Sequence, residues 1–361
     1  MIKIAIAGVG NCASSLLQAV ALARRTHSLP GVMRETIGPW SAADIEVVAA
    51  FDIDDRKVGR PLSEAALAEP NCTWVFEPNL SIHTIGVQMA PILDGVAPHM
   101  RDEAGGRGFR PADKPAVDIT AALRQSGASI LVCYLPVGSQ KAVEYYAQCC
   151  LDAGVGLINC VPVFIASNPQ WAARFTKAKL PIIGDDIKSQ LGATIVHRML
   201  AWLFDMRGIT IDRTYQLNTG GNTDFRNMLA RDRLVSKKLS KTASVQSMLD
   251  EPIPASDVHI GPSDYVHWQK DNKVCFMRME GRGIGGAPVE LEVRLSVQDS
   301  PNSAGVVIDA VRCAALALEE GIGGPLTGPS AAFMKSPPVQ MHDLEAQRQC
   351  DEFIAGATVK A

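Results

Sequence analysis

The first half of the chain alternates short apolar runs with segments in which apolar residues recur at helical spacing. The apolar runs have the length of strands, and we expect strands over residues 3–7, 45–51, 73–76, 129–135, 155–159 and 181–184. The helical spacing predicts helices over residues 14–24, 116–125, 140–153 and 169–177. This alternation is typical of the α/β class, and six strands suit a Rossmann-type doubly wound parallel sheet with helices on both faces.

The pattern changes after an apolar helix expected over residues 191–204. Three strand-length runs follow, and no helical segment separates the last two, which predicts a second, largely antiparallel sheet over residues 209–217, 274–280 and 289–297. Two amphipathic helices close the chain and are expected to pack on the first domain, at residues 304–318 and 344–354. The sequence therefore predicts a discontinuous Rossmann-type domain over residues 1–190 and 302–361, and an α+β domain over residues 191–301.

Charge and composition narrow the classes of partner. The 361 residues include 35 Lys and Arg against 38 Asp and Glu, so the chain has no general basic field for nucleic acid or an anionic membrane. The N-terminus lacks the pattern of a signal peptide, and the apolar stretches are too short to cross a bilayer. We therefore expect a cytoplasmic protein whose partners are small molecules.

A glycine-rich turn follows the first expected strand and opens a helix. This is the context that a dinucleotide fingerprint requires, because Gly8 permits a tight turn and Gly10 lets a pyrophosphate approach. Ala13 replaces the third glycine, and the amides of Asn11 and Cys12 begin the helix that would hold the phosphates. The alternative is an ordinary turn between a strand and a helix.

The second strand is followed by an acidic residue, Asp52. A carboxylate at this point accepts hydrogen bonds from the adenosine ribose and repels a 2′-phosphate, so it favours NAD over NADP. The acid usually follows the glycines by about 20 residues, and the insertion over residues 25–43 places Asp52 farther along the chain. Asp54 and Asp55 are rivals for the same role.

Residues at the ends of the fourth and fifth strands are candidates for cofactor contacts, because ligands bind at the carboxyl ends of parallel strands. Cys133, Tyr134 and Leu135 end the fourth strand, and residues 159–162 end the fifth. Ordinary punctuation of strands is the alternative.

Three polar clusters are harder to explain as structure, at residues 184–189, 218–224 and 236–241. Paired carboxylates and clustered lysines indicate an anionic substrate and proton transfers. On a helix, Lys237 and Lys241 would share one face and repel each other, and a bound phosphate would relieve that repulsion. The alternative is a solvated basic face.

Five segments in order, GDDIKSQ at 184–190, LNTGGNTDFRNM at 217–228, SKKLSKT at 236–242, DSPNSAG at 299–305 and FMKSPP at 333–338, resemble the myo-inositol-1-phosphate synthase family. The length is similar to that of its shorter bacterial members. Eukaryotic members carry a longer Gly-Gly-Asn-Asn-Gly loop where this chain has Gly-Asn-Cys-Ala, so contacts within that loop carry over for Gly8, Gly10 and Asn11 only.

The resemblance implies an isomerising cyclisation of D-glucose 6-phosphate to 1L-myo-inositol 1-phosphate, the first step of inositol biosynthesis. NAD is reduced and then reoxidised, without net redox change: oxidation at carbon 5, enolisation at carbon 6, intramolecular aldol addition to carbon 1, and reduction. The discontinuous first domain would hold NAD, and the domain over residues 191–301 would carry catalysis and assembly into a homotetramer.

The resemblance also assigns residues. Four lysines would bind phosphate, and would transfer protons if burial and neighbours lower their pKa toward neutrality: Lys237, Lys241, Lys273 and Lys335. Two carboxylates would position these lysines or the substrate hydroxyls: Asp186 and Asp224. Substrate contacts would include Asn218 and Asn222, and cofactor contacts Asp186, Ser189, Asp299 and Ser300. A helix cap near residue 303 is the alternative for Asp299, and Lys188 is a further candidate for cofactor contact.

Metal use stays open. The seven histidines show no pair at metal-ligand spacing, and an oxygen-rich site for a cation of unknown identity near a phosphate is compatible with the family. Two rival functions also remain: an NAD-dependent dehydrogenase similar to homoserine or amino-acid dehydrogenases, and a catalytically silent NAD-binding sensor.

Overall fold

The computed structural model describes residues 1–101, 106–230, 244–249 and 252–358. Seven strands form a parallel sheet in the order β11-β6-β5-β4-β1-β2-β3. Their bounds are Ile2–Ala7 (β1), Ile45–Asp52 (β2), Val87–Met89 (β3), Ile130–Cys133 (β4), Gly156–Asn159 (β5), Pro181–Ile183 (β6) and Gly324–Pro325 (β11). The order from β3 to β6 is that of the Rossmann fold, so the predicted parallel sheet is confirmed, with β11 added at one edge.

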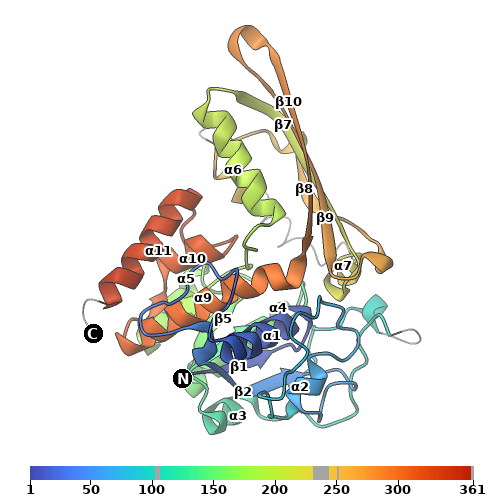
Figure 1. Ribbon diagram of the computed structural model, residues 1–361, viewed down its shortest axis with the longest axis vertical. Helices are drawn as coiled ribbons and strands as arrows, with labels where there is room; N and C mark the ends of the chain where they lie inside the picture. The colour runs from blue at the N-terminus through green and yellow to red at the C-terminus, as the bar shows by residue number, and fades with distance from the viewer. Residues whose placement is uncertain (102–105, 231–243, 250–251, 359–361) are drawn as a thin grey trace.

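Helices cover both faces of this sheet (Figure 1). The alternation of side chains along β1 explains why: Ile4 and Ile6 pack in one core with α1 and α9, whereas Ala5 and Ala7 pack in the other core with α3 and α4. The helices are Asn11–Thr26 (α1), Leu62–Ala65 (α2), Ile119–Ser126 (α3), Gln140–Ala153 (α4), Pro169–Ala178 (α5) and Asp299–Glu319 (α9).

The third strand was expected over residues 73–76, and this prediction is wrong. That segment is irregular because its polar groups bond to side chains of α1: Thr73 Oγ1 lies 2.9 Å from Ser15 Oγ, and Phe76 donates its amide to Gln18 Oε1 at 2.8 Å. The third strand of the sheet is β3 instead.

Helix α9, with 21 residues, is the longest of the helices that pack on the first sheet. Among the described residues it alone is long and apolar enough to cross a membrane by length and composition, but 83% of its apolar window is buried inside the protein. The helices α10 (Thr327–Phe333) and α11 (Asp343–Thr358) follow, and α11 buries Ala346 and Cys350 in the same core as α9. The C-terminal segment therefore packs on the same side of the first sheet as α9.

The second sheet has four strands in the order β10-β9-β7-β8 and stands away from the first sheet (Figure 1). Its strands are Thr210–Gly220 (β7), Val258–Tyr265 (β8), Asn272–Arg282 (β9) and Pro288–Gln298 (β10), and α6 (Ala193–Met206) packs on one face. Two pairs are antiparallel, as expected, but β8 pairs with β7 in parallel. The pattern did not reveal β8, because Gly261 and Pro262 interrupt it, and proline is tolerated at an edge.

Candidate active site

A cavity lies at the carboxyl ends of the first-sheet strands, and the turn between β1 and α1 forms part of its wall. Gly8 in this turn has φ +92°, and a Cβ there would lie 2.9 Å from the carbonyl oxygen of Tyr134. No described heavy atom lies within 4 Å of a Cβ built on Gly10, so its backbone stays open to a ligand. Asn11 and Cys12 begin α1 and also line the cavity. The turn thus fits the role predicted for it.

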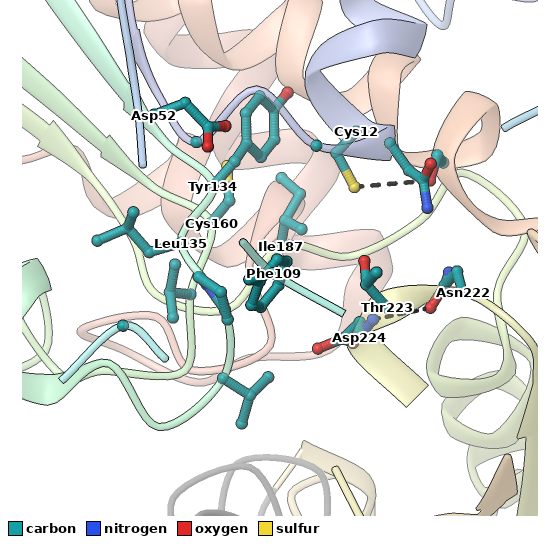
Figure 2. Close-up of a pocket in the computed structure, with 18 of the residues that line it drawn as sticks. Cys12, Asp52, Phe109, Tyr134, Leu135, Cys160, Ile187, Asn222, Thr223 and Asp224 are labelled. Carbon is teal, nitrogen blue, oxygen red and sulfur yellow. Dashed lines mark hydrogen bonds between the residues drawn. The ribbon is translucent and has the colours of Figure 1, made fainter. Parts of the chain in front are cut away.

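Asp52 at the end of β2 lines the same cavity (Figure 2). Its carboxylate accepts the amides of Val9 at 2.7 Å and Ile53 at 2.7 Å, which fixes its orientation beside the glycine turn. The two rivals are engaged elsewhere: Asp54 is buried in an ion pair with Arg56, and Asp55 pairs at the surface with Arg110. The geometry therefore favours Asp52 over both.

The insertion over residues 25–43 explains the long spacing between the glycines and Asp52. It packs behind α9, where Arg34 Nη1 forms an ion pair with Asp309 at 3.1 Å and Arg312 donates to the carbonyl of Glu35 at 2.8 Å. The extra residues are thus used in the core and do not displace the acid from the cavity.

The ends of β4 and β5 supply apolar wall to the cavity. Tyr134, Leu135 and Cys160 line it together, and Figure 2 shows them on the side of Asp52. The hydroxyl of Tyr134 is buried and has no hydrogen-bond partner among the described residues.

Three predicted site residues are buried in the interior instead of lining the cavity. Ala13 packs between α1 and the sheet, which is the packing role of this motif position. Cys133 points into the core under α4, because side chains alternate along β4. Asn218 is buried under the second sheet and donates to the carbonyl of Gly261 at 2.8 Å. Ala13 and Cys133 therefore have packing roles, and Asn218 is hydrogen-bonded within the second sheet.

The polar end of the cavity contains an ion pair between Lys335 and Asp186. Lys335 Nζ donates to Asp186 Oδ1 at 2.9 Å and to the carbonyl of Ile187 at 2.6 Å. The backbone holds the pair together, because the amide of Lys335 donates to the carbonyl of Asp186 at 2.7 Å and Ile187 forms a bridge with Met334. Two motifs far apart in the sequence therefore meet here.

The paired carboxylates at 185 and 186 have separate tasks. Asp185 is fully buried and accepts hydrogen bonds from Asn159 and from the amides of residues 165–167, so it ties its own loop to the end of β5 and to the connection that follows β5. Burial raises the pKa of Asp185 to about 6. Only Asp186 lines the cavity.

A second ion pair joins Lys273 on β9 to Asp299 at the start of α9, with 3.2 Å between Nζ and Oδ1. Burial alone would lower the pKa of Lys273, but the neighbouring carboxylate of Asp299 outweighs it and the pKa is raised. The condition for proton transfer by a lysine, a pKa lowered toward neutrality, is therefore not met by Lys273, which carries its charge at neutral pH. Asp299 is the first residue of α9 and not a cap near residue 303.

Asn222 and Asp224 approach from the end of β7 (Figure 2). Asn222 caps α7 (Thr223–Asn227) by accepting the amides of Asp224 and Phe225, both at 3.1 Å. Asn222 and Asp224 both line the cavity, as do Ser189 and Ser300.

The remaining predicted lysines differ in placement. Lys237 and Lys241 lie outside the described residues. Lys188 is buried away from the cavity, where its Nζ pairs with Asp343 at 2.9 Å and donates to the carbonyl of Ala331. It therefore joins the 184–190 segment to α10 and α11.

The sequence did not point to several residues of the site. Lys57 lines the cavity and donates to the carbonyl of Val9 and to Asn71 Oδ1, and Phe109 reaches in from the long connection before α3. Asp271 is buried behind the wall, and burial, aided by the charge of Asp299, raises its pKa to about 6. Only Asp271 had a sequence signal, its position two residues before Lys273.

Within the described residues, no group of three His, Cys, Asp or Glu side chains could hold a metal ion. The site chemistry there consists of lysine and aspartate pairs, amides and hydroxyls.

The strand order, the glycine turn and the second sheet define a Rossmann-like α/β enzyme. Its lysine–carboxylate site lies at the polar end of the cavity. A sequence profile described as myo-inositol-1-phosphate synthase matches residues 192–300. Inositol-3-phosphate synthase of Mycobacterium tuberculosis is 51% identical over 98% of this chain and 96% of its own, and that of Corynebacterium glutamicum is 50% identical over 99% of each. The chain belongs to the myo-inositol-1-phosphate synthase family.

A solved structure agrees on the fold. A myo-inositol-1-phosphate synthase-related protein from Thermotoga maritima superposes with a TM-score of 0.81 over 98% of both chains at 22% identity.

Proposed function

We propose that this protein converts D-glucose 6-phosphate to 1L-myo-inositol 1-phosphate with NAD as a cofactor that is regenerated in each turnover. The observation that carries the proposal is the pair of lysine–aspartate contacts, Lys335 with Asp186 and Lys273 with Asp299, in the same cavity as the glycine turn. Relatives at about 50% identity over the whole chain bear the name of this activity.

The residues at the other end of the cavity fit NAD. Helix α1 begins with no side-chain cap and no acidic residue in its first turn, so its first amides are available to a diphosphate. Asp52 lines the same cavity and suits a ribose hydroxyl. Bound NAD would supply a reversible hydride acceptor, which a cyclisation through a ketone requires.

The two ion pairs divide the remaining tasks. Lys273 keeps its proton, so its ammonium is suited to stabilise the negative charge that develops on a substrate oxygen during enolisation. Lys335 donates a hydrogen bond to Asp186 at 2.9 Å, so Lys335 can pass one of its protons to the carboxylate of Asp186 as its nitrogen takes the proton that leaves a substrate hydroxyl. Asp224 is placed to orient substrate hydroxyls, and Lys237 and Lys241 complete the proposed phosphate and proton-transfer set.

We also propose a homotetramer assembled through the second sheet. The face of this sheet opposite α6 carries Tyr215, Leu217 and Phe276, which are 36%, 36% and 46% exposed. An apolar patch on an open sheet face favours association. A monodisperse monomer in analytical ultracentrifugation at micromolar concentration would contradict the proposal.

The decisive test of the activity is product identification. Purified protein is incubated with glucose 6-phosphate and a catalytic amount of NAD, and the phosphate ester is identified by NMR. We expect inositol phosphate without net NADH, from wild type and from Lys179→Met, a control at an exposed lysine, and a strongly reduced yield from Lys335→Met. NADH in an amount equal to product would indicate a dehydrogenase, and NAD binding without any product a sensor.

A further inference from the structure

Asp271 is a buried carboxylate just before β9, and 1% of its surface is exposed. Four hydrogen bonds converge on it: Thr73 Oγ1 at 3.1 Å, Asn222 Nδ2 at 3.0 Å, Ser300 Oγ at 2.9 Å and the amide of Ser300 at 3.0 Å. The donors belong to three segments, which are far apart in the sequence. Two of the donor residues, Asn222 and Ser300, line the cavity.

The carboxylate of Asp271 serves as the cap of α9. The residue before the helix, Gln298, makes no side-chain cap hydrogen bond, while the side chain of Asp271 accepts the amide of Ser300 and its backbone carbonyl accepts the amide of Asp299 at 3.0 Å. A negative charge at a helix N-terminus is favourable because it satisfies open amides and meets the positive end of the helix dipole. The position of Asp299, the partner of Lys273, therefore depends on Asp271.

The same carboxylate also orients α7. Asn222 uses its amide nitrogen to donate to Asp271 and its amide oxygen to cap α7, on which Asp224 lies. Its link to Thr73 reaches α1, which packs on the first sheet, because Thr73 also contacts Ser15 of α1. One buried group thus connects both sheets and two helix starts at the polar end of the cavity.

We propose that Asp271 is a positioning residue that holds Asp224 and Asp299 in the geometry required for turnover, without touching the substrate itself. This inference rests on the proposed function. Asp271→Asn keeps the size of the side chain. Its NH2 group is a donor, however, and would meet other donors where a carboxylate oxygen now accepts their hydrogen bonds. The starts of α7 and α9 should then shift relative to each other.

The test compares Asp271→Asn with Asp309→Asn. Asp309 is also buried and accepts two side-chain hydrogen bonds, from Arg34 and Arg312, but it lies away from the cavity. For Asp271→Asn we expect kcat to fall by roughly 10- to 100-fold, the scale of a small misplacement of reacting groups, with the KM for glucose 6-phosphate within about threefold of wild type. Asp309→Asn should lose thermal stability and keep kcat within about threefold.

Hydrogen exchange supplies a readout that does not depend on activity. In Asp271→Asn, the amides of residues 222–228 and 298–303 should exchange faster, and in Asp309→Asn residues 222–228 should be unaffected. Wild-type kcat in a folded Asp271→Asn variant, or an equal loss of kcat in Asp309→Asn, would overturn the inference. Unchanged exchange in Asp271→Asn would overturn the positioning role of Asp271, whatever the activity of the wild type. A wild type that makes no inositol phosphate would instead overturn the proposed function.

If Asp271→Asn does not fold, Thr73→Val takes its place. This variant removes one of the four hydrogen bonds and leaves the carboxylate, so we expect a fall in kcat of about fivefold, the effect of one ordinary hydrogen bond. Wild-type kcat in Thr73→Val would then overturn the proposal.

Discussion

Replacing Lys335 by methionine tests the proposed chemistry most directly, because it keeps much of the side-chain volume and removes the ammonium. In the structure this ammonium donates to Asp186 at 2.9 Å and to the carbonyl of Ile187 at 2.6 Å. The side chains of Lys335 and Asp186 are 15% and 4% exposed, so the pair is largely shielded from water. We expect kcat to fall by roughly 10²- to 10⁴-fold, the usual effect of losing a positioned acid or base.

The magnitude separates a chemical effect from a structural one. Removing one partner of a buried ion pair costs about 3–5 kcal/mol of the free energy of unfolding, out of about 5–15 kcal/mol in a typical protein. A 100-fold loss of activity through unfolding alone would require about 99% of the molecules to be unfolded, since activity scales with the folded fraction. Circular dichroism at the assay temperature would detect that directly.

The assay measures kcat and KM for glucose 6-phosphate, the melting temperature and the Kd for NAD. The control is Lys188→Met, which removes a buried lysine paired with Asp343 outside the cavity. It should lower the melting temperature but reduce kcat less than about tenfold. Wild-type kcat for Lys335→Met at saturating substrate would refute the role of Lys335, and a rise in KM alone would show that it only binds phosphate.

Three further predictions follow from the geometry. Asp52→Ala should narrow the preference for NAD over NADP, measured by calorimetry, because a like charge no longer meets the 2′-phosphate; equal affinities in the wild type would contradict the assignment of Asp52. Gly8→Ala should weaken NAD binding and lower the melting temperature, since φ is +92° and the new Cβ would lie 2.9 Å from the carbonyl oxygen of Tyr134; an unchanged Kd would argue against the turn as the binding site. Burial lowers the pKa of His197 from 6.5 to about 4. Between these two pH values His197 takes up a proton in the unfolded chain but not in the folded protein. The free energy of unfolding therefore falls as the pH drops, by about 2 kcal/mol from pH 6.5 to pH 5. The melting temperature of His197→Gln should therefore decrease less than that of wild type between pH 7 and pH 5. An equal decrease would show that His197 does not cause the pH dependence.

The sequence alone determined the parallel sheet and the start of the cavity. Apolar runs that alternate with helical segments are a local pattern, and Gly8, Gly10 and Asp52 follow from the backbone geometry that a turn and a strand end require. The resemblance carried by five motifs identified Lys335, Asp186 and Lys273 as site residues, but it did not say which of them pair.

Tertiary structure decided those pairings. Lys335 and Asp186 are 149 residues apart, and their contact depends on a bridge between two loops that no local pattern encodes. The raised pKa of Lys273 likewise depends on Asp299, which the fold brings to β9 from the start of α9.

The dependence on tertiary contacts also explains where the structure differs from the elements predicted from the sequence. Residues 73–76 have the composition of a strand, yet their polar groups bond to α1, and β8 joins the second sheet in parallel despite an interrupted pattern. Asp271 is buried by segments that are distant in the sequence, and the same segments supply the four hydrogen bonds that it accepts. Local periodicity reports which face of an element is apolar, whereas the partner of a buried charge is set by which segments the fold brings together.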